Sequence, residues 1–89
     1  MQHRITGIRK PDVNSSVKHI THVRYDGNVH TRETVIRLID AGTDSFYVYE
    51  YGEHSDVHVV HPHNGNPYIR TAPDVDGEER DNLLSLPQI

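Results

Sequence analysis

The chain contains no cysteine among its 89 residues. Without cysteine, neither a disulfide framework nor a zinc site built from thiolates can form, and a reducing, cytoplasmic setting is favoured. No apolar run reaches the length of a signal peptide or a membrane span, so we expect no membrane contact. The Gly-rich phosphate loop and the nucleophile elbow of hydrolases are also missing, which gives nucleophilic catalysis little support.

Apolar residues are scarce as well. Leu, Ile, Val and Phe make up 22 of the 89 residues, whereas fewer than roughly 20% is typical of disordered chains. The composition therefore predicts one small folded domain over residues 1–89, with a thin core. A thin core in a short chain favours a further surface on which to bury apolar side chains, so we expect a homo-oligomer.

The charge balance is acidic. The chain has 13 acidic and 9 basic residues, a formal net charge of −4, and eight histidines. An acidic chain argues against nucleic acid as a partner. Protonation of all eight histidines would change the net charge from −4 to +4, so the electrostatics depend on pH between about 5 and 7.

The first half of the chain predicts two strands and a helix. Residues 4–9 and 19–24 are short β-branched segments that resemble each other, joined by a polar loop over residues 10–17. Asp26 to Asn28 read as a turn. Thr31 is a good helix N-cap, and apolar residues at helical spacing predict a helix over residues 32–41 that ends before Gly42.

The second half predicts a hairpin and a last strand. Residues 45–51 and 56–61 alternate, and we expect Tyr51 to pair with Asp56 across a four-residue loop. One face then holds the apolar residues Phe46, Val48, Val57 and Val59, and the other holds the tyrosines Tyr47, Tyr49 and Tyr51. Residues 68–71 form a short final strand, and residues 72–80 form a polar loop.

The apolar C-terminal residues Leu83, Leu84 and Leu86 must pack on the rest of the protein. We expect this tail to cover the second sheet face, over Tyr47, Val60 and Ile69, because one helix covers only one face. The predicted fold is α+β: a small antiparallel sheet of about five strands in the order β-β-α-β-β-β, with one helix on one face and the C-terminal apolar tail on the other.

This order and several short motifs resemble a bacterial and phage family known as domain of unknown function 3892. The matching features are Ile5-x-x-Ile8, Ile20-x-x-Val23, the helix end at Gly42, the strands Phe46–Tyr49 and Val57–Val60, Tyr68-Ile69-Arg70-Thr71, and Asn82-Leu83-x-x-Leu86-Pro87. They cover nearly the whole chain. The resemblance implies a small α+β protein and brings no established activity, so no catalytic residue follows from it.

Four histidines lie within one stretch of ten residues, 54–63, in and directly after the predicted hairpin. His54 and His58 share a strand face, whereas His61 points to the other side and His63 lies in the following turn. We take His58, His61 and His63 as candidate ligands for zinc or nickel, with Glu53 or Asp56 completing the site. The alternative is a set of unrelated surface histidines.

Five residues are candidates for binding an anionic ligand: Arg24, Tyr49, Arg70, Thr71 and Asn82. Arginines on neighbouring strands can converge on a phosphate or a carboxylate, and a row of tyrosines can stack on a flat ligand. The alternatives are surface arginines paired with acids, and tyrosines that are half-buried or form a dimer surface.

The sequence favours a non-enzymatic binding or regulatory module for a small anionic ligand or a protein partner. In a chain of this length, a deep catalytic pocket would require two subunits. The alternative is a metal-dependent enzyme or metal sensor that uses the hairpin histidines. Nucleic-acid binding through the tyrosine face is a third possibility, which the net acidity disfavours.

Overall fold

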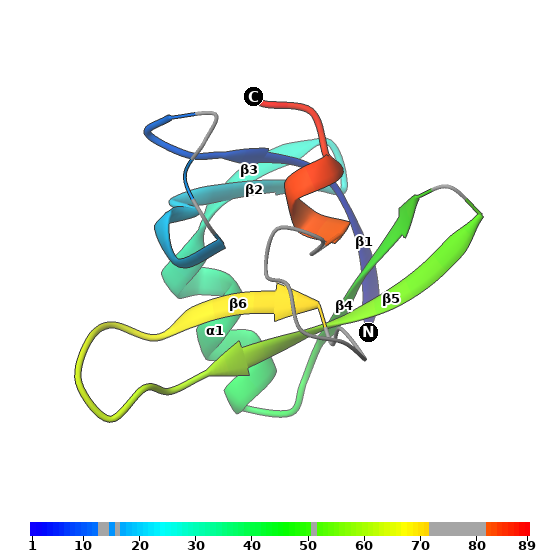
Figure 1. Ribbon diagram of the computed structural model, residues 1–89. Helices are drawn as coiled ribbons and strands as arrows, with labels where there is room; N and C mark the ends of the chain where they lie inside the picture. Colours follow the sequence, from blue (N-terminus) through cyan, green and yellow to red (C-terminus); the bar gives the residue numbers. More distant parts are fainter. Residues whose placement is uncertain (13–14, 16, 51, 72–81) are drawn as a thin grey trace.

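The computed structural model describes residues 1–12, 15, 17–50, 52–71 and 82–89. One six-stranded sheet has the order β3-β2-β1-β4-β5-β6. It curves around the core, so that the β2–β3 and β5–β6 hairpins lie on opposite sides of it (Figure 1). The elements, in chain order, are β1 (Gln2–Arg9), η1 (Val17–His19), β2 (His22–Tyr25), β3 (Asn28–Thr31), α1 (Arg32–Asp40), β4 (Ser45–Glu50), β5 (Glu53–Val60), β6 (Tyr68–Thr71) and η3 (Asn82–Ser85).

A β2–β3 hairpin takes the place of the predicted isolated turn. Asp26 and Gly27 have φ angles of 52° and 78°, the two positive values of a tight type I′ hairpin turn. Strand β3 was missed because it is only four residues long and Val29 is its one apolar residue. The second predicted strand also begins later than expected, because Val17–His19 forms a 3₁₀ turn.

The sheet is mixed, so the prediction of an antiparallel sheet is wrong at its centre. Strand β1 pairs with β4 in parallel, with His3 opposite Phe46. Helix α1 carries the chain from the β3 edge to this central position, which is the crossover that parallel strands require. The alternation of apolar and polar residues does not reveal which strand pairs with β1, because that pairing depends on how helix α1 packs.

The β4–β5 hairpin forms, but its predicted register is wrong. Tyr47 pairs with Asp56, and Glu50 with Glu53, so the loop is two residues shorter than expected. Gly52 has a φ of 74°, which glycine adopts at little cost. The predicted faces survive because the register differs by an even number of residues. Phe46, Val48 and Val57 are accordingly buried.

Helix α1 matches its prediction closely. The Thr31 hydroxyl accepts a hydrogen bond from the Thr34 amide at 3.2 Å, as an N-cap should. The helix ends at Asp40, one residue early, with Ala41 as its C-cap. Val35 and Ile36 are its buried residues, and they pack into the same cluster as Phe46.

The C-terminal tail is docked on the domain, as expected. Leu83 and Leu86 are buried within the apolar core cluster that also contains Phe46 and Val35. The tail then runs alongside β1 (Figure 1), where the Ile8 amide donates to the Pro87 carbonyl at 3.0 Å and the Ile89 amide donates to the Ile8 carbonyl at 2.9 Å. Tyr47, expected beneath the tail, instead stacks on His54 and is half-exposed.

The predicted loop over residues 72–80 lies outside the described residues, as does Tyr51. Within the described part of the chain, no helix is long and apolar enough to cross a membrane.

Candidate anion-binding site

The two arginines predicted to converge lie far apart in the sheet. Arg24 is on β2 and Arg70 is on β6, and strands β1, β4 and β5 separate them. The Arg24 Nε donates to the Thr6 hydroxyl at 3.2 Å, and the Arg70 Nε donates to the Thr71 carbonyl at 3.3 Å. The structure therefore does not bring these guanidinium groups to one ligand.

The other predicted ligand-binding residues do not gather around either arginine. Tyr49 is 46% exposed and lies beside Arg4, whose Cζ is 5.6 Å from the ring centroid. Thr71 is buried and pairs with Val57. Asn82 begins η3, and its side chain lies outside the described part of the structure. The five residues are thus spread over β2, β4, β6 and η3.

The three histidines predicted as metal ligands also diverge. His58 pairs with Arg70 across β5 and β6. The His61 Nε2 lies 3.1 Å from a carboxylate oxygen of Asp40, and His63 is exposed in the turn before β6. Among the residues that the structure describes, no group of three or more potential ligands is placed to hold a metal ion.

A different part of the molecule forms a cleft of about 390 Å³. Its walls come from η1, the start of α1 and the turn between β5 and β6. The lining residues are Pro11, Lys18, His19, Thr21, Arg32, Pro62, Asn64, Gly65, Asn66 and Tyr68. These described lining residues include two permanent cations and a histidine but no carboxylate, in a chain whose net charge is −4.

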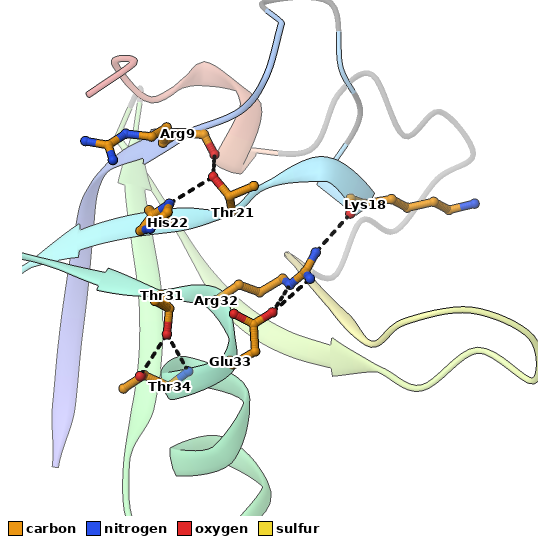
Figure 2. Close-up of polar contacts among 8 residues, drawn as sticks. All are labelled: Arg9, Lys18, Thr21, His22, Thr31, Arg32, Glu33 and Thr34. Carbon is orange, nitrogen blue, oxygen red and sulfur yellow. Dashed lines mark hydrogen bonds and ion pairs between the residues drawn. The ribbon is translucent and has the colours of Figure 1, made fainter.

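Arg32 is held in the cleft by several hydrogen bonds. Its backbone amide donates to the Thr21 carbonyl at 2.9 Å, and its Nη1 donates to the Lys18 carbonyl at 3.3 Å. Figure 2 shows the guanidinium between that carbonyl and Glu33, with the Lys18 side chain extending away from it. These contacts fasten the beginning of α1 to η1 and fix one wall of the cleft.

Glu33 partly balances the Arg32 charge. The Nε and Nη2 atoms of Arg32 donate to one Glu33 oxygen at 3.1 and 2.8 Å. The hydrogen bond from Arg32 lowers the pKa of the Glu33 carboxyl, so this acid stays ionised in neutral solution. A guanidinium carries five N–H donors. The bonds to Glu33 and Lys18 use three of its nitrogens once each, and donor capacity remains for a ligand.

Lys18 and Tyr68 also line the cleft. The Lys18 ammonium lies 5.8 Å from the centroid of the Tyr68 ring, within the range of a cation–π contact. Tyr68 is itself largely buried, so the ring is a firm support. The exposed turn at Asn64 to Asn66 adds amide groups at the rim.

The sequence prediction considered only arginines carried by strands and so passed over this cleft. Lys18 is in a segment expected to be a loop end and strand start, and its proximity to Arg32 depends on the β2–β3 hairpin. One local signal was present. A cation directly after the helix N-cap interacts unfavourably with the helix dipole, which favours acids there. An arginine at position 32 therefore indicates a role other than stabilising the helix.

A second polar cluster surrounds His3, which is 8% exposed. Its Nδ1 lies 2.8 Å from an Asp26 oxygen, and its Nε2 lies 2.6 Å from an Asp44 oxygen. Its ring also packs against Tyr25 and Phe46, with centroids 4.8 and 5.0 Å away. Each ring nitrogen of His3 thus lies within hydrogen-bond distance of a carboxylate oxygen.

The charges of this cluster act on one another. The hydrogen bond from His3 lowers the pKa of the Asp44 carboxyl. Burial raises the pKa of Tyr25, and the negative charges of Asp44 and Asp26 raise it further. Both ring nitrogens of His3 are already engaged by carboxylates from other segments. The cluster therefore serves to join β1, the β2–β3 turn and the start of β4.

Comparison with known proteins gives a family without a known activity. No curated protein and no solved structure is significantly similar to this chain. The family described as "Protein of unknown function (DUF3892)" matches residues 4–87. Because the match extends over almost the entire sequence, the chain belongs to the DUF3892 family.

Proposed function

We propose that this protein is a non-enzymatic binding module that takes a small anionic ligand, a phosphate or a carboxylate, in the cleft between η1, α1 and the β5–β6 turn. The observation that carries the proposal is the concentration of Lys18, His19 and Arg32 on one cleft of an acidic protein.

The physical argument rests on charge and on anchoring. Lys18 and Arg32 stay positive at neutral pH, and each is held by a contact within the domain. An anion entering the cleft therefore meets positive charge whose position is already fixed, which reduces the entropy lost on binding. The cleft volume of about 390 Å³ lies within the range of small-molecule sites.

A titration with inorganic phosphate tests the proposal. Binding should shift the backbone amide resonances of Lys18, His19 and Arg32 in ¹⁵N-labelled protein. Lys18→Gln should lower the affinity for phosphate at least about fivefold, because a charge-assisted contact is lost. The matched control is Arg24→Gln, which removes the same charge from a partly exposed site on β2.

The control separates a local site from a general effect of charge. If Arg24→Gln and Lys18→Gln lower the affinity for phosphate equally, only the net charge of the protein matters and the proposed site is wrong. If phosphate and acetate shift no resonance of the cleft at millimolar concentration, the anion-binding function is refuted.

A further inference from the structure

The outer face of the sheet, on the side away from the apolar core, carries two arginines on neighbouring strands. Arg4 and Thr6 on β1 are exposed, and Ile5 between them is buried. The Arg24 Nε on β2 donates to the Thr6 hydroxyl at 3.2 Å, so Arg24 lies on the same face. Because Arg24 pairs with Gly7, strand geometry places the Cα atoms of Arg4 and Arg24 roughly 10 Å apart.

Both arginines contact neutral groups. Arg24 donates to the Thr6 hydroxyl, and the Arg4 Nη2 donates to the Tyr49 carbonyl at 3.0 Å. Among the residues that the structure describes, no carboxylate contacts either guanidinium. A guanidinium carries five N–H donors, so most donors of each arginine remain available to an anion.

An exposed aromatic ring lies beside this pair. Tyr49 on β4 is 46% exposed, and the Arg4 Cζ is 5.6 Å from its ring centroid. The paired part of β1 and β4 ends with Arg4 opposite Tyr47, and the β4–β5 hairpin then extends away from β1 (Figure 1). Arg4 therefore connects β1 to the diverging strand. Arginine and tyrosine are enriched in protein interfaces and among the residues that contribute most to binding.

The charge distribution indicates which partner fits. Asp56 on β5 is exposed and lies opposite Tyr47, so the face is positive at β1 and β2 and negative at β5. A long polyanion such as nucleic acid would be repelled by this acid and by the net charge of −4. A short acidic segment would meet only the arginine side.

The shape of the surface favours a protein over a small molecule. Arg4, Arg24 and Tyr49 line neither the cleft at Lys18 nor a second cleft along α1. Small molecules usually bind in concave sites, whereas a peptide segment can bind to an open face through a few arginine and aromatic contacts.

We propose that this face binds an acidic, extended segment of a protein partner. Alternate side chains of an extended segment are about 7 Å apart, a spacing that the long side chains of Arg4 and Arg24 can match. Two carboxylates contact the arginines, and an aromatic side chain next along the same side of the segment contacts Tyr49. The face is separate from the proposed anion-binding cleft and does not depend on it.

Two peptides that differ only in charge test the proposal. The acetylated peptide amide Glu-Ser-Glu-Ser-Phe places both carboxylates and the ring on one side of an extended chain. Gln-Ser-Gln-Ser-Phe is its uncharged control, and both are titrated into the ¹⁵N-labelled full chain. The acidic peptide should shift the amide resonances of Thr6, Arg24 and Tyr49 and bind at least about fivefold more tightly than the control.

Substitutions separate the contacts. Arg24→Gln, Arg4→Gln and Tyr49→Thr should each lower the affinity for the acidic peptide at least about threefold, through loss of a cation or of the ring. Threonine is a good strand former, so Tyr49→Thr should retain the fold. Arg37→Gln is the matched control. It removes the same charge from an exposed position on α1, away from this face, and should leave the affinity unchanged.

The amides that respond distinguish this face from the cleft. Shifts confined to Lys18, His19 and Arg32 would refute the face and leave the proposed cleft in place. Equal affinities of the two peptides, or no binding at millimolar concentration, would also refute it. If a short oligothymidylate shifts the amides of the face at lower concentration than the acidic peptide, the partner is nucleic acid. If raising the protein concentration alone shifts them, the partner is a second copy, and either result overturns the proposal.

Discussion

Replacing His3 with leucine should lower the stability of the protein, because it removes the contacts to Asp26 and Asp44. Leucine keeps much of the apolar volume beside Tyr25 and Phe46 but removes both ring donors. The Nε2 contact to Asp44 is short and largely sheltered, with side chains 9% and 19% exposed. The Nδ1 contact reaches Asp26, whose side chain is 62% exposed, so that ion pair contributes little.

The magnitude follows from the sheltered contact. A hydrogen bond to a charged group contributes about 1.5–3 kcal/mol to stability, and an exposed ion pair contributes about 0–1 kcal/mol. We therefore expect His3→Leu to lower the free energy of unfolding by about 2–3 kcal/mol. Asp26→Asn is the matched control, since asparagine also tolerates the positive φ of 52° at this turn; it should cost less than about 1 kcal/mol.

The loss should also depend on pH in a defined direction. His3 holds the pKa of Asp44 below its usual value of 3.8. A carboxyl whose pKa is lower in the folded state stabilises the fold fully above the unfolded pKa, and this contribution disappears as pH falls through the folded pKa. The difference between wild type and His3→Leu that comes from Asp44 should therefore shrink as the pH falls below about 4.

Urea denaturation at pH 6 and at several values between 3 and 5 measures both quantities, with a common m-value as the check that only stability has changed. A loss below about 0.5 kcal/mol at pH 6 would show that the cluster does not join the three segments. If the loss of unfolding free energy stays the same down to pH 3, the effect of His3→Leu does not depend on the Asp44 charge.

Other predictions concern the core, the cap, Tyr25 and assembly. Leu83→Ala should cost about 2–5 kcal/mol in urea denaturation, because Leu83 is fully buried; a small loss would mean that the tail is not essential to the core. Thr31→Ala should cost about 1 kcal/mol through loss of the N-cap, whereas Thr31→Ser should restore it. Absorbance titration of Tyr25 should show a pKa above 10, the direction that burial imposes, and a normal value would contradict the closed cluster. Native mass spectrometry should show the expected homo-oligomer; a monomer at all concentrations would refute that expectation.

Local patterns predicted the parts of this fold that are governed by local forces. The Thr31 cap, the α1 helix and the buried face of Phe46 and Val48 all follow from side-chain spacing, and the structure confirms them. The hairpin register failed, because the two-residue turn at Gly52 depends on a backbone conformation that alternation does not specify.

The non-local features could not be found in this way. The parallel pairing of β1 with β4 depends on how α1 packs after crossing the sheet. The meeting of Lys18 and Arg32 depends on the β2–β3 hairpin, which lies between them in the chain. His3 was overlooked for a similar reason, since its two carboxylate partners are 23 and 41 positions away in the sequence. The predicted metal ligands His58, His61 and His63 are close in sequence, but their side chains do not converge in the structure.

The position of β1 has a consequence for folding. The hairpins β2–β3 and β4–β5 join neighbouring segments and can form early, but the central pairing of β1 with β4 joins residues 43 positions apart, such as Arg4 and Tyr47. Closing such a loop costs entropy before the contact gives any return. We therefore expect β1 to join the sheet late, so that substitutions in it mainly accelerate unfolding, while substitutions in the hairpins slow folding.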